Sequence, residues 1–328
     1  MRGKSSYESS VLDKWGQPAA GVLDEREANM VQKTRLIRKI KPYIMVAPAL
    51  IGILVFTIYP AIKLIHLSFM NTNMLNPAAS KFVGWDNYKK VFARPDFYKS
   101  LSNTFIYTIA VVFLITVCAL LLAVWLHEKD SKLNQLVQAT VFLPHVVSIV
   151  SIALVFKWMM EPNFGLFNFL LRKMGLPTSS WLSGSSTAMA CVIAISLWKA
   201  VGYDVLILLA ALRSVPTSIY EAAKLDNANR AVMFFKITLP MISPTVFYLI
   251  ITGFIGAFKA YSDAVALFGT NLNAAEMNTI VGYVYDMLYG DSGGYPSYAS
   301  AAAILLFIIV LTITCINLLV SRKHVHYT

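Results

Sequence analysis

Six long apolar runs dominate this sequence, and each is close to the length that a helix needs to cross a bilayer. A transmembrane helix takes about 20 consecutive apolar residues, because the hydrocarbon core is about 30 Å thick. The sequence therefore predicts an all-α polytopic membrane protein with six transmembrane helices. The predicted spans are Tyr43–Leu67, Ser100–Leu126, Leu136–Met160, Thr187–Leu212, Met241–Leu267 and Ser300–Val320.

Composition supports a membrane protein and argues against two other classes. Only 14% of the 328 residues are charged, whereas soluble domains carry about 25%. The net charge of +11 does not indicate nucleic-acid binding, because the basic residues form no recognition helix or patch. The three cysteines, Cys118, Cys191 and Cys315, all fall inside apolar runs, where they act as small buried hydrophobes. Neither disulfides nor a metal site is expected.

Basic residues predict the orientation of the chain in the membrane. The two termini and the connections at 127–135 and 213–240 carry seventeen Lys and Arg, and the opposite connections carry seven. The more basic side of a membrane protein normally faces the cytoplasm. We therefore expect both termini to be cytoplasmic. The predicted domains are a cytoplasmic tail at 1–42, a transmembrane domain at 43–320 with a cytoplasmic loop at 214–240, and a second cytoplasmic tail at 321–328.

The stretch from Ser214 to Pro244 is a polar, helix-forming interruption of the apolar sequence. Its segment Ser218–Glu221 fits a capping box, which marks the start of a helix. Asp226 and Asn227 then break the helix, because Asn tolerates the left-handed conformation of a helix–helix corner. A second helix is predicted from Ala228 to Thr238, closed by Pro240 and Pro244. Two short helices meeting at an angle on the membrane surface are expected.

The same stretch resembles the coupling-helix signature of binding-protein-dependent ABC importer permeases, whose membrane core is MetI-like. The signature reads E-A-A-x-x-D-x-A followed by I-T-L-P. This sequence departs from it at one point, with Asn227 in place of the usual glycine. The resemblance implies that the loop contacts an ATP-hydrolysing subunit. The residues expected to do so are Glu221, Ala222, Ala223, Asp226, Asn227, Ala228 and Pro240.

Three further strings resemble the same family. Residues 82–104 contain F-V-G-W-D-N-Y and a later N-T pair, an aromatic-rich segment that either anchors in the head groups or docks an external partner. Phe142-Leu143-Pro144 opens the third span, where the proline is expected to kink the helix. Residues 158–177 match an outer re-entrant segment, and their amphipathic pattern predicts a short helix in the interface.

Ionisable residues within the spans identify a candidate substrate path. A charged side chain at membrane depth is energetically costly, so it indicates a functional site. In the fifth span Lys259 and Asp263 are one helical turn apart and could pair with each other. Alternatively, Lys199 and Lys259 extend to the outer interface, or the groups line a polar, aromatic cavity for a sugar. Resemblance to maltose-type permeases implies that the fourth and fifth spans line the path. The candidate residues are Trp198, Lys199, Tyr203, Gly253, Ala257, Lys259, Ala260, Tyr261 and Asp263.

No catalytic or cofactor motif is present. The sequence contains neither a G-x-x-x-x-G-K-[ST] phosphate loop nor an H-E-x-x-H metal motif, so it is not expected to be an enzyme or to hold a cofactor. By resemblance, its partners are the bilayer, a second homologous permease, two ATP-binding-cassette subunits that hold ATP and Mg²⁺, and an extracytoplasmic solute-binding protein. Nucleic acid is not expected.

The resemblance implies that the complex imports a carbohydrate across the cytoplasmic (inner) membrane of a bacterium. An oligosaccharide is expected, and five basic residues in the first outer connection indicate either an acidic solute or an acidic surface on the solute-binding protein. Two alternatives stay open: the same fold importing another small solute such as glycerol phosphate, and a stand-alone channel. A channel needs a ring of like groups along one face, and the sequence shows none.

Overall fold

The computed structural model describes residues 41–72, 80–127, 131–269, 272, 276–290 and 294–324. It divides into two compact units, residues 1–63 and 64–328. Most of the predicted N-terminal tail, residues 1–40, lies outside the described residues. The first predicted span is a helix from Lys41 to Ser68, which contains the π turn η2 (Leu54–Ile58) and ends in α2 (Tyr59–Ser68).

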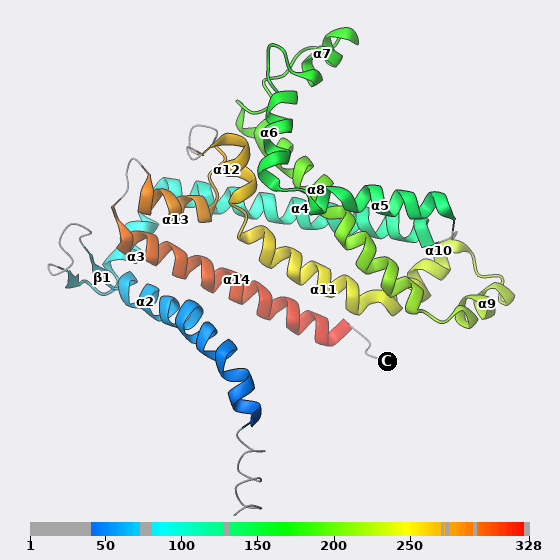
Figure 1. Ribbon diagram of the computed structural model, residues 1–328, viewed down its shortest axis with the longest axis horizontal. Coiled ribbons are helices and arrows are strands. Elements are labelled where there is room, and N and C mark those ends of the chain that lie inside the picture. Colours follow the sequence, from blue (N-terminus) through cyan, green and yellow to red (C-terminus); the bar gives the residue numbers. More distant parts are fainter. Residues whose placement is uncertain are drawn as a thin grey trace, which may run out of the picture. The chain divides into compact units, whose positions relative to one another are not determined.

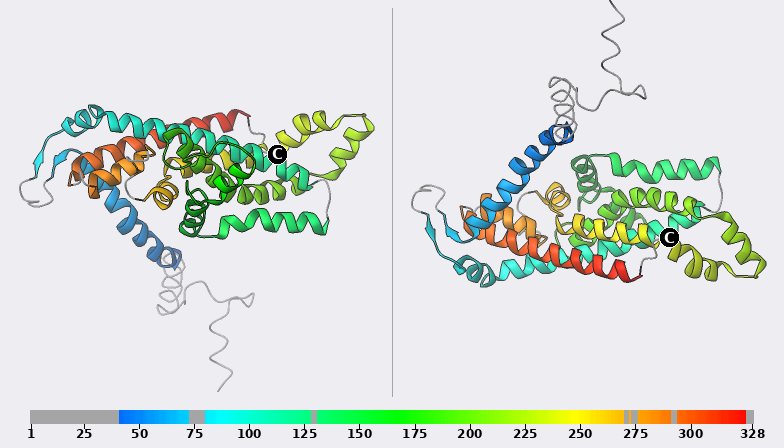
Figure 2. Two further views of the ribbon diagram at one scale, coloured as in Figure 1. Left: turned by 90° about the horizontal axis from the view of Figure 1, so that it is seen from above. Right: turned by 90° about the horizontal axis from the view of Figure 1, so that it is seen from below.

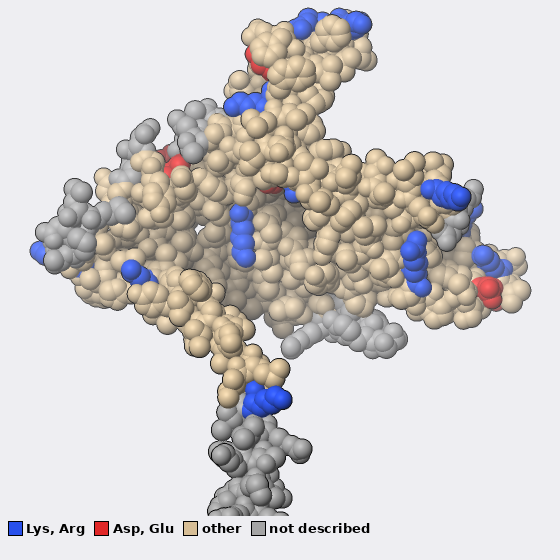
Figure 3. Space-filling model, viewed as in Figure 1, with Lys and Arg blue, Asp and Glu red and all other residues tan. Residues whose placement is uncertain are grey.

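Four long helices form the core of the second unit. They are α4 (Pro95–His127), α8 (Ser185–Ser214), α11 (Leu239–Phe258) and α14 (Pro296–His324). Helix α4 packs on α8 and α11, and α14 packs on α11 (Figure 1). The fully buried Ala119 and Ala123 let α4 approach its neighbours closely. Charged side chains are sparse over the face drawn in Figure 3 and gather toward α9 and around α7.

The predicted number of spans depends on one bent pair of helices. Among the described residues, five helices are long and apolar enough to cross a membrane, and α5 (Lys132–Val146) with α6 (Ile149–Met159) adds a sixth if the pair is one span. The pair bends by 97°. Val147 and Ser148 make the bend with extended backbones, ψ 141° and 133°. The expected kink therefore lies just after Pro144 and is a complete break.

Helix α5 and helix α6 take different partners. Helix α5 packs on α8, where a Cβ atom on Gly202 would collide with the carbonyl oxygen of Val141. Glycine is therefore required at the closest approach of these two helices. Helix α6 packs on α12 (Ser262–Phe268) and leads to the short helix α7 (Leu166–Lys173), which confirms the helix predicted within 158–177. Its place in the interface stays a prediction.

The fifth span differs from its prediction at both ends. It begins at Arg230 rather than Met241, because α10 (Arg230–Met233), the π turn η4 (Phe234–Thr238) and α11 run on as one helix. Pro240 and Pro244 therefore do not close a helix. The wider π turn accommodates the missing N–H and the ring of Pro240 in the next turn. At the other end α11 stops at Phe258, and a non-helical segment separates it from α12.

The two ends of this helical unit carry different structures (Figures 1 and 2). One end holds α9 (Thr217–Leu225) and α10. The opposite end holds α3 (Asp86–Phe92), α13 (Ile280–Tyr289) and the antiparallel pair β1 (Met70–Asn71) and β2 (Lys81–Phe82). The loop at 214–240 and the first and third predicted outer connections thus lie at opposite ends, whereas α7 of the second outer connection projects from the side (Figure 1).

Candidate functional site

The loop between α8 and α11 turns at Asn227, as predicted. Asn227 has φ 55°, and the N–H of Ala228 donates to the carbonyl of Ala223 at 3.0 Å while that of Asn227 donates to Lys224 at 3.0 Å. These two bonds form a Schellman C-cap. The predicted capping box is wrong, because the helix already begins at Thr217 with Pro216 before it and no side-chain cap.

A second cap and a cross-loop bond complete the corner. The Asn229 side chain accepts a hydrogen bond from the N–H of Val232 at 2.8 Å, so Asn229 starts the helix that continues into α11. The Tyr220 hydroxyl lies 3.1 Å from the Thr238 hydroxyl. This bond joins α9 to the π turn η4. The loop is one short helix held against the end of a long one, rather than two short helices.

Exposure within the loop separates outward-facing from inward-facing residues. Glu221, Ala222 and Asp226 are exposed, whereas Ala223 is only 8% exposed and packs within the chain. Ala223 is therefore less accessible than its neighbours on α9, and its contact with an ATP-hydrolysing subunit stays a prediction. Leu225 is 85% exposed and Phe235 66% exposed. Phe235 belongs to the fifth span, whereas Leu225 lies on the polar helix α9, where a large exposed apolar side chain is typical of a protein–protein contact.

A cavity of about 460 Å³ lies between α4, α8, α11 and the break that precedes α12. It receives side chains from helices far apart in sequence, and eight of the nine predicted path residues line it. These are Lys199, Tyr203, Gly253, Ala257, Lys259, Ala260, Tyr261 and Asp263. Trp198 does not line it: its ring packs against Phe156, with centroids 5.5 Å apart, in a separate apolar groove.

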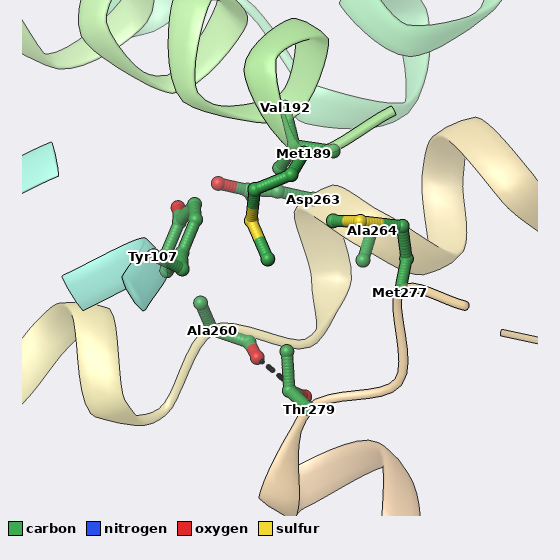
Figure 4. Close-up of a pocket in the computed structure, with 8 residues that line it drawn as sticks. All are labelled: Tyr107, Met189, Val192, Ala260, Asp263, Ala264, Met277 and Thr279. Atoms are coloured by element: carbon green, nitrogen blue, oxygen red, sulfur yellow. Dashed lines mark hydrogen bonds between the residues drawn. The ribbon is translucent and has the colours of Figure 1, made fainter. Parts of the chain in front are cut away.

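Asp263 takes part in a polar cluster at one side of this cavity. Its Oδ2 accepts a hydrogen bond from Ser196 Oγ at 3.3 Å, and Ser196 Oγ lies 2.9 Å from the hydroxyl of Tyr107. Figure 4 shows the Asp263 carboxylate directed toward Tyr107. The predicted one-turn pairing with Lys259 is wrong, because α11 ends at Phe258 and the two residues do not share a helix.

The break in the fifth span has its own support. The hydroxyl of Thr279, at the start of α13, donates to the carbonyl of Ala260 at 3.0 Å (Figure 4). A carbonyl at a helix break has lost its helical donor, and a side-chain hydroxyl satisfies it. The bond holds Lys259, Ala260 and Tyr261 at the cavity wall.

Comparison with known proteins identifies the family. Residues 115–324 match the model of the binding-protein-dependent transport system inner membrane component. The chain belongs to this family. It is 31% identical to the arabinooligosaccharides transport system permease protein AraP of Bacillus subtilis, over 87% of this chain and 89% of that protein.

Two further relatives are informative about this permease. The sn-glycerol-3-phosphate transport system permease protein UgpA of Pectobacterium atrosepticum is 29% identical over 87% of this chain and 95% of that protein. A solved bacterial ABC transporter involved in the import of the acidic polysaccharide alginate matches with a TM-score of 0.78 and 28% identity, over 88% of this chain and 99% of that one. The chain is therefore a multi-pass inner-membrane permease with the MetI-like fold.

Several cavity residues of this permease were not expected from the sequence. Tyr107 and Thr116 come from α4, Ser196 from α8 and Thr252 from α11. In the sequence each of them is a polar residue within an apolar run. Polar residues that pack between helices show the same pattern, so the sequence does not distinguish the two roles. His145 also lines the cavity, and its ring stacks on that of Tyr203, with centroids 5.0 Å apart.

Proposed function

We propose that this permease carries an oligosaccharide through the cavity between α4, α8 and α11. The observation that carries the proposal is the lining of that cavity, which combines hydroxyls, charged groups and aromatic rings around about 460 Å³. Sugars need donors and acceptors for their hydroxyls and an apolar face for their ring carbons. Gly253, Gly256 and Ala257 line the same cavity, and their small side chains leave room for a bulky solute.

The two cavity lysines favour an acidic sugar. The ammonium groups of Lys199 and Lys259 form no salt bridge within the described part of the chain, although the carboxylates of Asp204 and Asp263 line the same cavity and Asp263 is bonded to Ser196. Lysines without a salt-bridge partner can bind the carboxylate of an anionic solute. The alginate transporter is named for an acidic polysaccharide, which supports this choice. AraP is named for arabinooligosaccharides, so a neutral oligosaccharide is the comparison substrate.

Glycerol phosphate is the second candidate. The same two lysines would serve a phosphate group, and UgpA is named for this solute. A cavity of about 460 Å³ is within the range of a drug-sized ligand site and larger than glycerol phosphate needs. This size favours the oligosaccharide.

Transport is proposed to be driven from the α9 loop. Partner subunits would hold ATP and Mg²⁺, and a second homologous permease and an extracytoplasmic solute-binding protein would complete the complex. Glu221, Ala222, Asp226 and the exposed Leu225 would contact an ATP-hydrolysing subunit at the cytoplasmic face, and both termini would lie on that side. This chain itself would hold no cofactor and catalyse no reaction.

The loop and the cavity are linked through one helix. Movement of α9 passes through the Tyr220–Thr238 bond into the helix that starts at Arg230 and ends at the cavity. Alternating access requires only two packed states that nucleotide and solute favour differently.

The test is transport by the complete complex in proteoliposomes with its binding protein. Uptake and ATP hydrolysis are measured with alginate oligosaccharides, arabino-oligosaccharides and glycerol phosphate. We expect alginate oligosaccharides to be taken up, and Lys199→Gln and Lys259→Gln to reduce their uptake more than that of neutral sugars. Lys173→Gln, on α7 outside the cavity, is the control. Uptake without an ATP-hydrolysing subunit, or of glycerol phosphate alone, would contradict the proposal.

A further inference from the structure

Three tyrosine rings follow one another from the cavity toward the end of α13. The ring centroids of Tyr261 and Tyr285 are 5.2 Å apart, and those of Tyr285 and Tyr289 are 5.1 Å apart. We propose that this tyrosine ladder is a carbohydrate-binding entry path, along which sugar rings pass from the end of the protein opposite α9 into the cavity. The inference rests on the proposed function, because it assigns a second binding surface to the same cargo.

The ladder joins an exposed surface to the cavity wall. Tyr261 lines the cavity, Tyr285 is half-buried, and Tyr289 is 69% exposed. Tyr285 and Tyr289 are four residues apart on α13, so they lie on the same face of that helix. Helix α13 lies at the end opposite α9 (Figure 1). A solute that arrives at this end meets Tyr289 first and Tyr261 last.

Hydrogen bonds fix the two parts of the ladder relative to each other. The hydroxyl of Thr279 accepts from the N–H of Gly282 at 3.2 Å and donates to the carbonyl of Ala260 at 3.0 Å. The N–H of Ile280 donates to the hydroxyl of Thr104 on α4 at 2.9 Å. The start of α13 is therefore tied both to the core and to the residue next to Tyr261. Binding groups held in place before the ligand arrives lose little entropy when it binds.

Tyrosine suits a surface that must bind sugars without holding them. Its ring offers a flat apolar face to the C–H groups of a sugar ring, and its hydroxyl can exchange hydrogen bonds with sugar hydroxyls. Two side-chain torsions limit the entropy lost on contact. The rings of the ladder are tilted by 36° and 49° to one another. They therefore present successive faces and edges rather than one closed stack. Mutual packing of the three rings alone is the alternative that the experiment must exclude.

The experiment measures sugar taken up per ATP hydrolysed by the complete importer in proteoliposomes, with alginate trisaccharide and arabinotriose delivered by the binding protein. We expect Tyr285→Leu and Tyr289→Leu to lower this ratio about five- to tenfold, since sugar released at the outer end then escapes before it reaches the cavity. Tyr285→Phe and Tyr289→Phe keep the ring and should retain most of the ratio. The matched control is Tyr295→Leu, a 45% exposed tyrosine outside the ladder that stacks on Tyr298.

Each outcome decides between the possibilities. A ratio that is unchanged in both leucine variants overturns the ladder and leaves the proposed function standing. An equal loss in Tyr295→Leu shows that the rings matter only for packing. A loss in the phenylalanine variants as large as in the leucine variants shows that the hydroxyls rather than the ring faces carry the effect, and it overturns a path built on ring contacts. If the unmodified importer takes up neither sugar, the proposed function fails and the ladder fails with it.

Discussion

The hydroxyl groups of Tyr220 and Thr238 lie 3.1 Å apart and join α9 to the π turn at the start of the fifth span. Tyr220 also packs on the buried cluster of α8 and α11 that contains Leu212 and Ile242. The short helix and the long one are thus connected by both a polar and an apolar contact. We therefore expect a movement of α9 to be transmitted to α11 through these two contacts.

Removal of this bond should weaken the coupling between ATP hydrolysis and transport. Tyr220→Phe keeps the ring and its packing and loses one hydrogen bond, which is worth about 1 kcal/mol. We expect uptake per ATP to fall about threefold to fivefold in proteoliposomes, while the complex still assembles. Ser214→Ala removes a local bond to Ala211 and should have no effect. A Tyr220→Phe importer with the coupling ratio of the unmodified protein would refute this role.

A charge at Ala222 should disrupt the contact with the ATP-hydrolysing subunit. Ala222 is exposed on α9 beside Leu225, and a carboxylate in an apolar contact is costly because it loses its water. Ala222→Asp should reduce uptake at least tenfold and reduce co-purification of the ATPase. Ala93→Asp places the same charge on an exposed residue at the opposite end and serves as the control. Normal uptake by Ala222→Asp would show that α9 does not face the partner.

The corner at Asn227 should tolerate glycine but not a β-branched residue. Its φ of 55° costs an ordinary L-residue about 1–2 kcal/mol, and glycine nothing. We expect Asn227→Gly to leave uptake and the melting temperature unchanged or slightly higher. Asn227→Val should lower both, and the melting temperature of the purified complex checks the difference. Equal behaviour of the two variants would indicate that this corner changes conformation in the assembled importer.

The cavity can be filled without disturbing the helices. A Cβ atom on Gly256 meets no atom within 4 Å, and Gly256 lines the cavity. Gly256→Leu should therefore fold normally and reduce uptake of a pentasaccharide more than that of a disaccharide. Gly52→Leu also enters open space but lies outside the cavity, so its uptake should be unchanged. Equal loss for both sugar lengths would indicate a folding defect rather than a smaller path.

The sequence predicted the spans and the corner well because their signals are local. Apolar runs of sufficient length and an Asn at a helix break depend on a few neighbouring residues. The break at Lys259–Tyr261 was missed because the apolar pattern continues past it and its support, Thr279, lies nineteen residues further on. The continuous helix through Pro240 was missed because a π turn leaves no mark in the sequence.

The candidate cavity was largely predictable, with one instructive exception. Trp198 and Lys199 are adjacent in sequence, yet they lie on different sides of α8 because successive residues of a helix are rotated by about 100°. Which of the two faces the cavity depends on the packing of α4 and α11 against α8, and this packing is not encoded in the local pattern. The same reason explains why Tyr107 and Ser196 were not selected.

The unbroken path from Arg230 to Phe258 has a mechanical consequence. These 29 residues form a rod about 43 Å long at 1.5 Å per residue. A tilt of about 5° about the end next to α9 displaces the far end by about 4 Å, because the helix is that long. Displacement of this size exceeds the radius of a water molecule and occurs where the rod stops, next to Lys259. The interruption of the fifth span therefore places the largest displacement of this helix at the cavity proposed to bind the sugar.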